Sequence, residues 1–118
     1  MRDYLKGGGA ILATGTSGLN ADATQALLPE LGIKPAGIWP ASNLYLRYGR
    51  LISRDVPPMD HVIYDPAVRL KPATGTNPLG YFVEAYFDRS WRHFCSHFQT
   101  PPDKPTRHPF ATLRGRPR

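Results

Sequence analysis

Hydrophobic and polar positions in the first part of the chain form short apolar runs separated by glycine-rich breaks. Residues 1–6 end at three glycines and are typical of the last turns of a helix, because glycine takes the left-handed conformation that closes a helix. Residues 9–15 (GAILATG) form an apolar run that predicts a buried strand of a parallel sheet covered on both faces. Helix, glycine turn and buried strand together indicate an α/β unit.

A second helix is predicted between residues 20 and 31. Asn20 or Asp22 is a suitable N-cap, and Gly32 follows the last apolar position. The apolar residues at helical spacing are Ala23, Ala26, Leu27, Leu28 and Leu31. Pro29 removes one backbone donor inside this pattern, so the helix is expected to be kinked or short.

The pattern changes to strand-like segments in the second half. Residues 44–48 alternate between two kinds of side chain and predict a strand. Residues 61–72 and 81–87 are rich in β-branched and aromatic residues and predict two strands, joined by the turn-rich segment 73–80. After residue 100 the chain is rich in proline and arginine, and little regular structure is expected there.

Residues 86–99 (YFDRSWRHFCSHFQ) are the densest cluster of aromatic and polar side chains. Asp88 is a suitable N-cap for a helix there. The positions i, i+3, i+4 and i+7, which share one helical face, are Trp91, Phe94, Cys95 and Phe98. The pattern therefore predicts a helix with one apolar face.

This cluster is also the candidate functional site. Aromatic rings beside histidine, arginine and glutamine are suited to stack on a sugar or to dock against another domain. The alternative is a core helix with its rings buried and its charged residues in water. The candidate contact residues are Tyr86, Asp88, Arg89, Trp91, His93, His97 and Gln99.

The sequence gives weaker support to a metal site or to a pair of catalytic carboxylates. His93 and His97 are four residues apart, as in some zinc sites, but no glutamate lies between them and a structural site needs four ligands. No metal or other cofactor is therefore predicted. For glycoside hydrolysis, which needs two carboxyl groups about 5–10 Å apart, the only candidates are Glu84 and Asp88.

The glycine-rich segments near the N-terminus match neither a phosphate-binding loop nor a nucleophile elbow in full. The glycines of residues 7–9 precede the predicted strand, whereas phosphate-binding loops follow a strand. Ser17, in GTSG, lacks the first glycine of a nucleophile elbow. Ser17, Thr16 or Cys95 remains the nucleophile of an alternative interpretation, a small hydrolase or amidotransferase-like enzyme.

Length, charge, cysteine count and the length of apolar runs limit the classes of protein to which this chain can belong. A chain of 118 residues fits one domain. Most of the net charge of +6 lies in residues 101–118, so no continuous basic face for nucleic acid is predicted. The single cysteine excludes an intrachain disulfide. No stretch approaches the roughly 18 apolar residues of a membrane span, and the N-terminus makes a poor signal peptide, so a soluble chain of unassigned location is expected.

The segment YLKGGGAILATGTSGLNADATQALLPELGI resembles the amidotransferase-like domain of bacterial β-galactosidase-like glycoside hydrolases, known in family 42 enzymes as the β-galactosidase trimerisation domain. Residues 81–105 are similar to the segment that follows in a related group of hydrolases. The resemblance implies a flavodoxin-like, three-layer α/β fold related to class I glutamine amidotransferases, without the nucleophilic cysteine. It also implies that hydrolysis belongs to a separate barrel domain, so no catalytic residue is transferred to this chain.

Family members continue into further strands where this sequence reads HPFATLRGRPR, which makes a truncated or frame-shifted gene product one interpretation. We expect residues 1–100 to form a partial accessory domain and residues 101–118 a Pro/Arg-rich tail. The expected partners are the catalytic barrel domain of a glycoside hydrolase or like subunits, and carbohydrate is a further candidate ligand. A free-standing carbohydrate-binding module is a second alternative.

Overall fold

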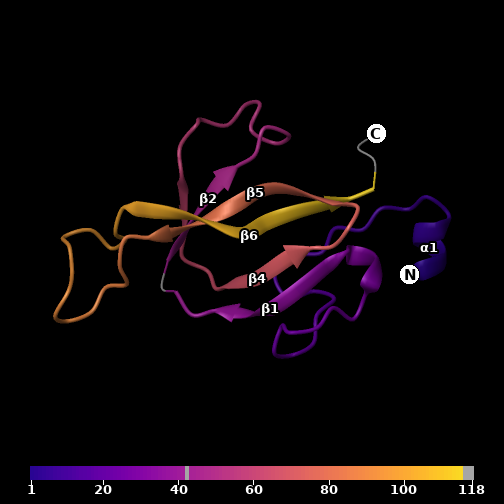
Figure 1. Ribbon diagram of the computed structural model, residues 1–118, viewed down its shortest axis with the longest axis horizontal. Helices are drawn as coiled ribbons and strands as arrows, with labels where there is room; N and C mark the ends of the chain where they lie inside the picture. The colour runs from indigo at the N-terminus through magenta and orange to yellow at the C-terminus, as the bar shows by residue number, and fades with distance from the viewer. Residues whose placement is uncertain (42, 116–118) are drawn as a thin grey trace.

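The computed structural model of this chain describes residues 1–41 and 43–115. It is built mainly from antiparallel strands (Figure 1). In chain order the elements are α1 (Arg2–Lys6), the short 3-10 helix η1 (Pro29–Leu31), β1 (Ile33–Trp39), β2 (Leu44–Tyr48), β3 (His61–Ile63), β4 (Ala67–Pro72), β5 (Thr76–Ala85) and β6 (Pro102–Arg114). In this part of the chain no helix is long and apolar enough to cross a membrane.

The strands form two sheets. Strands β1 and β4 pair as a two-stranded antiparallel ribbon, and the other four form a sheet in the order β3-β2-β5-β6. Strand β5 lies inside the larger sheet and pairs antiparallel with both β2 and β6. The β5–β6 ladder extends from Thr76 opposite Arg114 to Ala85 opposite Pro102, with several register shifts.

The predicted flavodoxin-like α/β fold is wrong. All of the ladders between named strands are antiparallel, whereas a flavodoxin-like sheet is parallel. A parallel sheet needs crossover connections of about a dozen residues or more, usually helical. The longest helix among the described residues is α1, with five residues, so the connections observed here do not supply such crossovers.

The predicted strand at residues 9–15 and the helix at residues 20–31 are also wrong. Residues 9–15 form no strand, and Leu12 is 90% exposed. Asn20 caps a tight turn instead of a helix, since its Oδ1 accepts hydrogen bonds from the backbone N–H groups of Thr24 and Gln25, each at 2.8 Å. Such local side-chain bonds compete with helix formation. Only η1 is helical there.

Several local predictions are confirmed. Residues 2–6 are helical, Gly32 closes η1 in the left-handed conformation with φ 64°, and β2 spans the predicted strand Leu44–Tyr48. The predicted strands in residues 61–72 and 81–87 are confirmed in part. Residues 61–72 form two strands of different sheets, β3 and β4, and the predicted turn segment 73–80 is wrong from Thr76 onward, where β5 already begins.

The expected lack of regular structure after residue 100 is wrong for β6. This strand carries Pro102, Pro105 and Pro109 and lies at the edge of its sheet. An edge strand tolerates proline, because half of its N–H groups have no partner in the sheet to lose. The basic residues Arg116 and Arg118 lie outside the described residues.

The hydrophobic core lies between the two sheets. Leu44 of β2, Ala67 of β4 and Phe82 of β5 form its centre. Partly buried side chains around this centre include Trp39, Leu46, Ile63 and Phe110. His108 Nδ1 lies 3.1 Å from the carbonyl oxygen of Leu70, so β6 also contacts β4.

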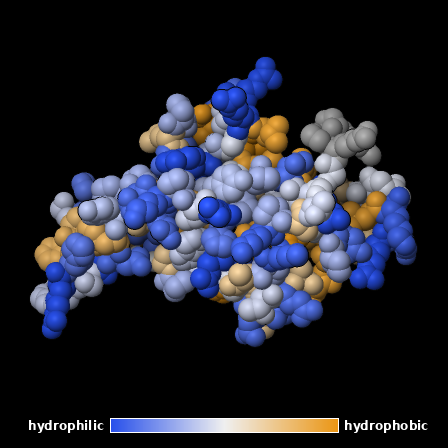
Figure 2. All heavy atoms as spheres, viewed as in Figure 1, coloured by the Kyte–Doolittle hydropathy of each residue, from blue (hydrophilic) through white to orange (hydrophobic). Residues whose placement is uncertain are grey.

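The molecule is thin and elongated, with extents of 54 × 34 × 19 Å. Its radius of gyration is 15.9 Å, against about 13.5 Å for a compact domain of this length. Orange, hydrophobic surface is visible near both ends of the long axis in Figure 2. The chain therefore buries a small core and exposes much of its apolar surface.

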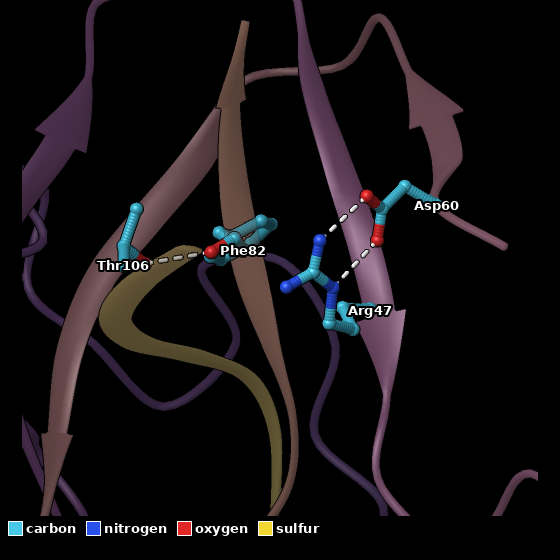
Figure 3. Close-up of polar contacts among 4 residues, drawn as sticks. All are labelled: Arg47, Asp60, Phe82 and Thr106. Carbon is cyan, nitrogen blue, oxygen red and sulfur yellow. Dashed lines mark hydrogen bonds and ion pairs between the residues drawn. The ribbon is translucent and has the colours of Figure 1, made fainter. Parts of the chain in front are cut away.

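Figure 3 shows two of the side-chain contacts that join neighbouring segments. Arg47 of β2 donates two hydrogen bonds of 2.8 Å, from Nε and Nη2, to the two carboxylate oxygens of Asp60. The Thr106 hydroxyl of β6 donates to the Phe82 carbonyl oxygen of β5 at 2.9 Å. The hydrogen bond from Arg47 lowers the pKa of Asp60 below its ordinary value of 3.8, against partial burial, which raises it.

The first prediction concerns the core. Leu44→Ala should lower the free energy of unfolding by about 2–5 kcal/mol, because Leu44 is 1% exposed and its truncation leaves a cavity. Leu12→Ala, the matched change at a side chain that is 90% exposed, should change it by less than about 0.5 kcal/mol. Urea unfolding of the two variants measures the difference. Equal effects would contradict the assignment of the core.

The second prediction concerns the Arg47–Asp60 pair. The folded state lowers the pKa of Asp60, so the stabilisation is present above pH 3.8 and is lost as the pH falls through the folded-state value. Asp60→Asn should lower the free energy of unfolding by about 1 kcal/mol at neutral pH. The difference from wild type should shrink as the pH falls below 3.8, through the lowered folded-state pKa of Asp60. Asp55→Asn, at an exposed carboxylate of the same connection, is the control and should show neither effect.

Candidate functional site

The candidate residues lie on the β5–β6 loop, residues 86–101, which extends from one end of the sheet (Figure 1). Its base is fixed by Thr100, which is fully buried. The Thr100 hydroxyl donates to the Phe87 carbonyl oxygen at 2.8 Å, and the Phe87 N–H donates to that hydroxyl at 3.5 Å. The Tyr86 N–H donates to the Pro101 carbonyl oxygen at 2.9 Å, so both ends of the loop are held together.

A buried tyrosine attaches the loop base to the sheet. Tyr45 of β2 donates a hydrogen bond from its hydroxyl to the Thr100 carbonyl oxygen. Burial raises the pKa of Tyr45, and the nearby Tyr64 and Cys95 raise it further. The hydroxyl therefore stays protonated over the physiological range, as a donor to a carbonyl must.

The predicted helix at residues 88–98 is absent. Ser90 and His93 form an isolated antiparallel bridge, with N–H···O distances of 2.8 and 3.2 Å, and the Ser90 hydroxyl also accepts from the His93 N–H at 3.1 Å. This tight turn offers the backbone an alternative to helical hydrogen bonds. The aromatic side chains consequently do not form one buried face: Trp91 is 94% exposed, and Tyr86, Phe94 and Phe98 are exposed as well.

Internal contacts order part of the loop. Arg89 Nη1 donates to the Phe98 carbonyl oxygen at 3.1 Å, and the guanidinium lies 5.7 Å from the centre of the Phe98 ring. Tyr64, from the β3–β4 connection, contacts the same ring edge to face at 5.3 Å, and its hydroxyl donates to Gln99 Oε1 at 2.8 Å. Phe98 therefore joins the loop to the neighbouring connection.

The His93 ring and the Cys95 thiol make contacts within the loop, and His97 contributes its carbonyl oxygen. His93 stacks on Phe87 with ring centres 3.7 Å apart. The Cys95 thiol lies 3.3 Å from the His97 carbonyl oxygen and 3.7 Å from that of Gln99, where it can donate. In the described part of the chain, no group of three His, Cys, Asp or Glu side chains is placed to hold a metal ion. Thr16 and Ser17 lie far along the chain, in the exposed turn that ends at Gly18.

Two carboxylates considered in the sequence, Glu84 and Asp88, line one cavity of about 190 Å³. It lies where β1 ends, β2 begins and β5 ends. Its other lining residues are Trp39, Ala41, Asn43, Leu44, Ala85 and Phe87. We name this cavity the β5-end pocket. Sequence reasoning missed Trp39 and Asn43. Asn43 reaches Glu84 because the next residue, Leu44, pairs with Glu84, and Trp39 lies at the end of β1 in the other sheet.

A second, larger cavity of about 950 Å³ lies at the other end of the molecule. It separates the N-terminal segment 8–15 from the last part of β6, and apolar side chains such as Leu28, Leu31 and Phe110 line it. Few polar groups converge on it. This groove shows how incompletely the N-terminal segment covers the sheet.

No protein-family model matches the chain, and no curated protein sequence matches it. Among solved structures, α-L-fucosidase isoenzyme 2 from Paenibacillus thiaminolyticus is similar over 92% of this chain, with a TM-score of 0.79 and 30% sequence identity. The matched region is 16% of the fucosidase chain. The chain is related to a domain of a glycoside hydrolase. This similarity does not support the amidotransferase-like and trimerisation-domain assignment, and the antiparallel sheets do not fit it.

The third prediction concerns the anchor of the loop. Thr100→Val keeps the side-chain shape but removes the hydroxyl that satisfies the Phe87 backbone, so the free energy of unfolding should fall by about 1–3 kcal/mol. The amide of Tyr86 should also exchange its hydrogen faster. Thr14→Val, at an exposed threonine, should change neither quantity. Unaltered exchange in Thr100→Val would show that Thr100 does not hold the loop.

Proposed function

We propose that this chain is a non-catalytic accessory domain of a glycoside hydrolase, and that the β5–β6 loop packs against the catalytic barrel domain. The similarity to α-L-fucosidase isoenzyme 2 carries this proposal, because 92% of this chain matches a piece that is only 16% of that enzyme. In that enzyme, the matching segment belongs to a much longer chain. We expect the exposed side of the loop to pack against the catalytic part of such a chain.

The surface of the loop supports a docking role. Trp91, Phe94 and Tyr86 are large, exposed aromatic residues on a loop whose base is rigidly held. Aromatic anchors of this kind dominate the binding energy of protein interfaces. The small core and the elongated shape also support docking. A chain that buries little apolar surface by itself gains stability when a partner covers its exposed surface.

The enzyme alternative has less structural support. Ser17 lies in an exposed turn, and the Cys95 thiol faces carbonyl oxygens instead of a general base. An activated nucleophile needs a base within hydrogen-bond reach. The accessory role therefore accounts for more of what the structure contains than independent catalysis does.

The fourth prediction tests docking with a chimaera. The matching segment of the Paenibacillus thiaminolyticus fucosidase is replaced by this chain, and thermal unfolding and hydrolysis of a nitrophenyl α-L-fucoside are measured. We expect a folded, active chimaera. Replacing both Trp91 and Phe94 by serine should destabilise it by about 2 kcal/mol or more, because two anchors leave the interface.

Two controls complete this test. The matched control replaces Leu51 and Met59, exposed apolar residues of another loop, by serine and should leave the chimaera unchanged. In the isolated chain, neither double variant should affect unfolding. A chimaera that tolerates Trp91→Ser and Phe94→Ser without loss would refute docking through the loop, and hydrolysis by the isolated chain would favour the enzyme alternative.

A further inference from the structure

The β5-end pocket has the composition of a small-ligand site. Two aromatic residues, Trp39 and Phe87, line it together with the Asn43 amide and the carboxylates of Glu84 and Asp88. Ligand pockets in proteins typically combine apolar or aromatic walls with a few polar groups that fix orientation.

The aromatic walls are held in place by neighbouring rings. Trp39 makes edge-to-face contacts with Phe82 and His108, at 5.9 and 5.4 Å between ring centres. His93 stacks on Phe87, and Thr100 binds the Phe87 backbone. Trp39 ends β1, and Phe87 lies in the β5–β6 loop two residues after β5 ends. A ligand would meet a largely preformed pocket, which lowers the entropy cost of binding.

The polar groups determine which ligand fits. Two carboxylates accept hydrogen bonds and repel anions, and the amide of Asn43, a residue only 3% exposed, can both donate and accept. In the part of the chain that the structure describes, the Glu84 side chain makes no hydrogen bond or ion pair, so both of its oxygens remain available. These groups match the hydroxyls of a neutral polyol, whose C–H faces pack on aromatic rings.

We propose that the β5-end pocket binds one pyranose unit of a neutral sugar. This inference rests on the proposed function only in assigning the chain to a carbohydrate-processing protein. A cavity of about 190 Å³ accommodates one sugar ring. A hydrolytic pair must flank the bond between two rings, so Glu84 and Asp88 act here as hydrogen-bond acceptors and the pocket as a binding subsite.

The fifth prediction tests this pocket in the isolated 118-residue chain. D-galactose, L-fucose and D-glucose are titrated into isotope-labelled protein, and the resonances of the Trp39 indole N–H and the Asn43 side-chain amide are followed. At least one sugar should shift both resonances with a dissociation constant on the order of 1 mM. D-galacturonate should bind at least about tenfold more weakly, because its carboxylate meets Glu84 and Asp88.

Variants identify the groups responsible. Combining Glu84→Gln with Asp88→Asn should weaken binding of the neutral sugar about tenfold and reduce the discrimination against galacturonate. Both residues are exposed, so the fold should persist, and unfolding measurements check this. Asp55→Asn is the matched control for Asp88→Asn and should bind as wild type does.

Three results would overturn the inference. The first is the absence of resonance shifts with any neutral sugar at about 10 mM. The second is wild-type affinity in the double variant. The third is stronger shifts with choline than with any sugar, which would make the pocket a site for organic cations. Docking is measured separately, by the stability of the chimaera. A failure of sugar binding therefore leaves the docking proposal intact, and a failure of docking leaves the pocket measurement valid.

Discussion

The pairing of β5 with two neighbours supports everything else in this molecule. Its antiparallel ladders with β2 and β6 position Phe82 and Val83, both buried, and Phe82 contacts the core that joins the two sheets. The same strand ends at Ala85, where the β5–β6 loop begins. A chain this thin has few buried side chains, so the loop and the pocket depend on a small number of contacts around β5.

The strands were predictable where the local pattern agrees with the observed burial. Residues 44–48 form a strand as expected, whereas residues 61–72, expected as one strand, form β3 and β4 in different sheets. The apolar run 9–15 looks like a buried strand but lies beside an open groove, because no second layer covers it. Periodicity reports which residues prefer burial, and it contains no information on whether a covering surface exists.

The form of the candidate segment was not predictable from its local pattern. The aromatic density of residues 86–99 indicated a helix with one apolar face, yet Ser90 and His93 close a turn that competes with the helix. Glu84 and Asp88 share a helix-like spacing of four, and the structure places both beside a pocket for a different reason. Asn43 reaches that pocket because its neighbour Leu44 pairs with Glu84, and Trp39 reaches it from the end of β1 in the other sheet; no local pattern records either placement.

Phe87 belongs to both proposed sites. Its backbone is bound by Thr100 at the base of the docking loop, and its ring lines the pocket. His93, on the loop, stacks on the same ring. A partner that displaces the loop would also displace Phe87 through these contacts, because close-packed groups move together. The proposed docking surface and the proposed ligand pocket thus share Phe87, although they use different faces of the segment.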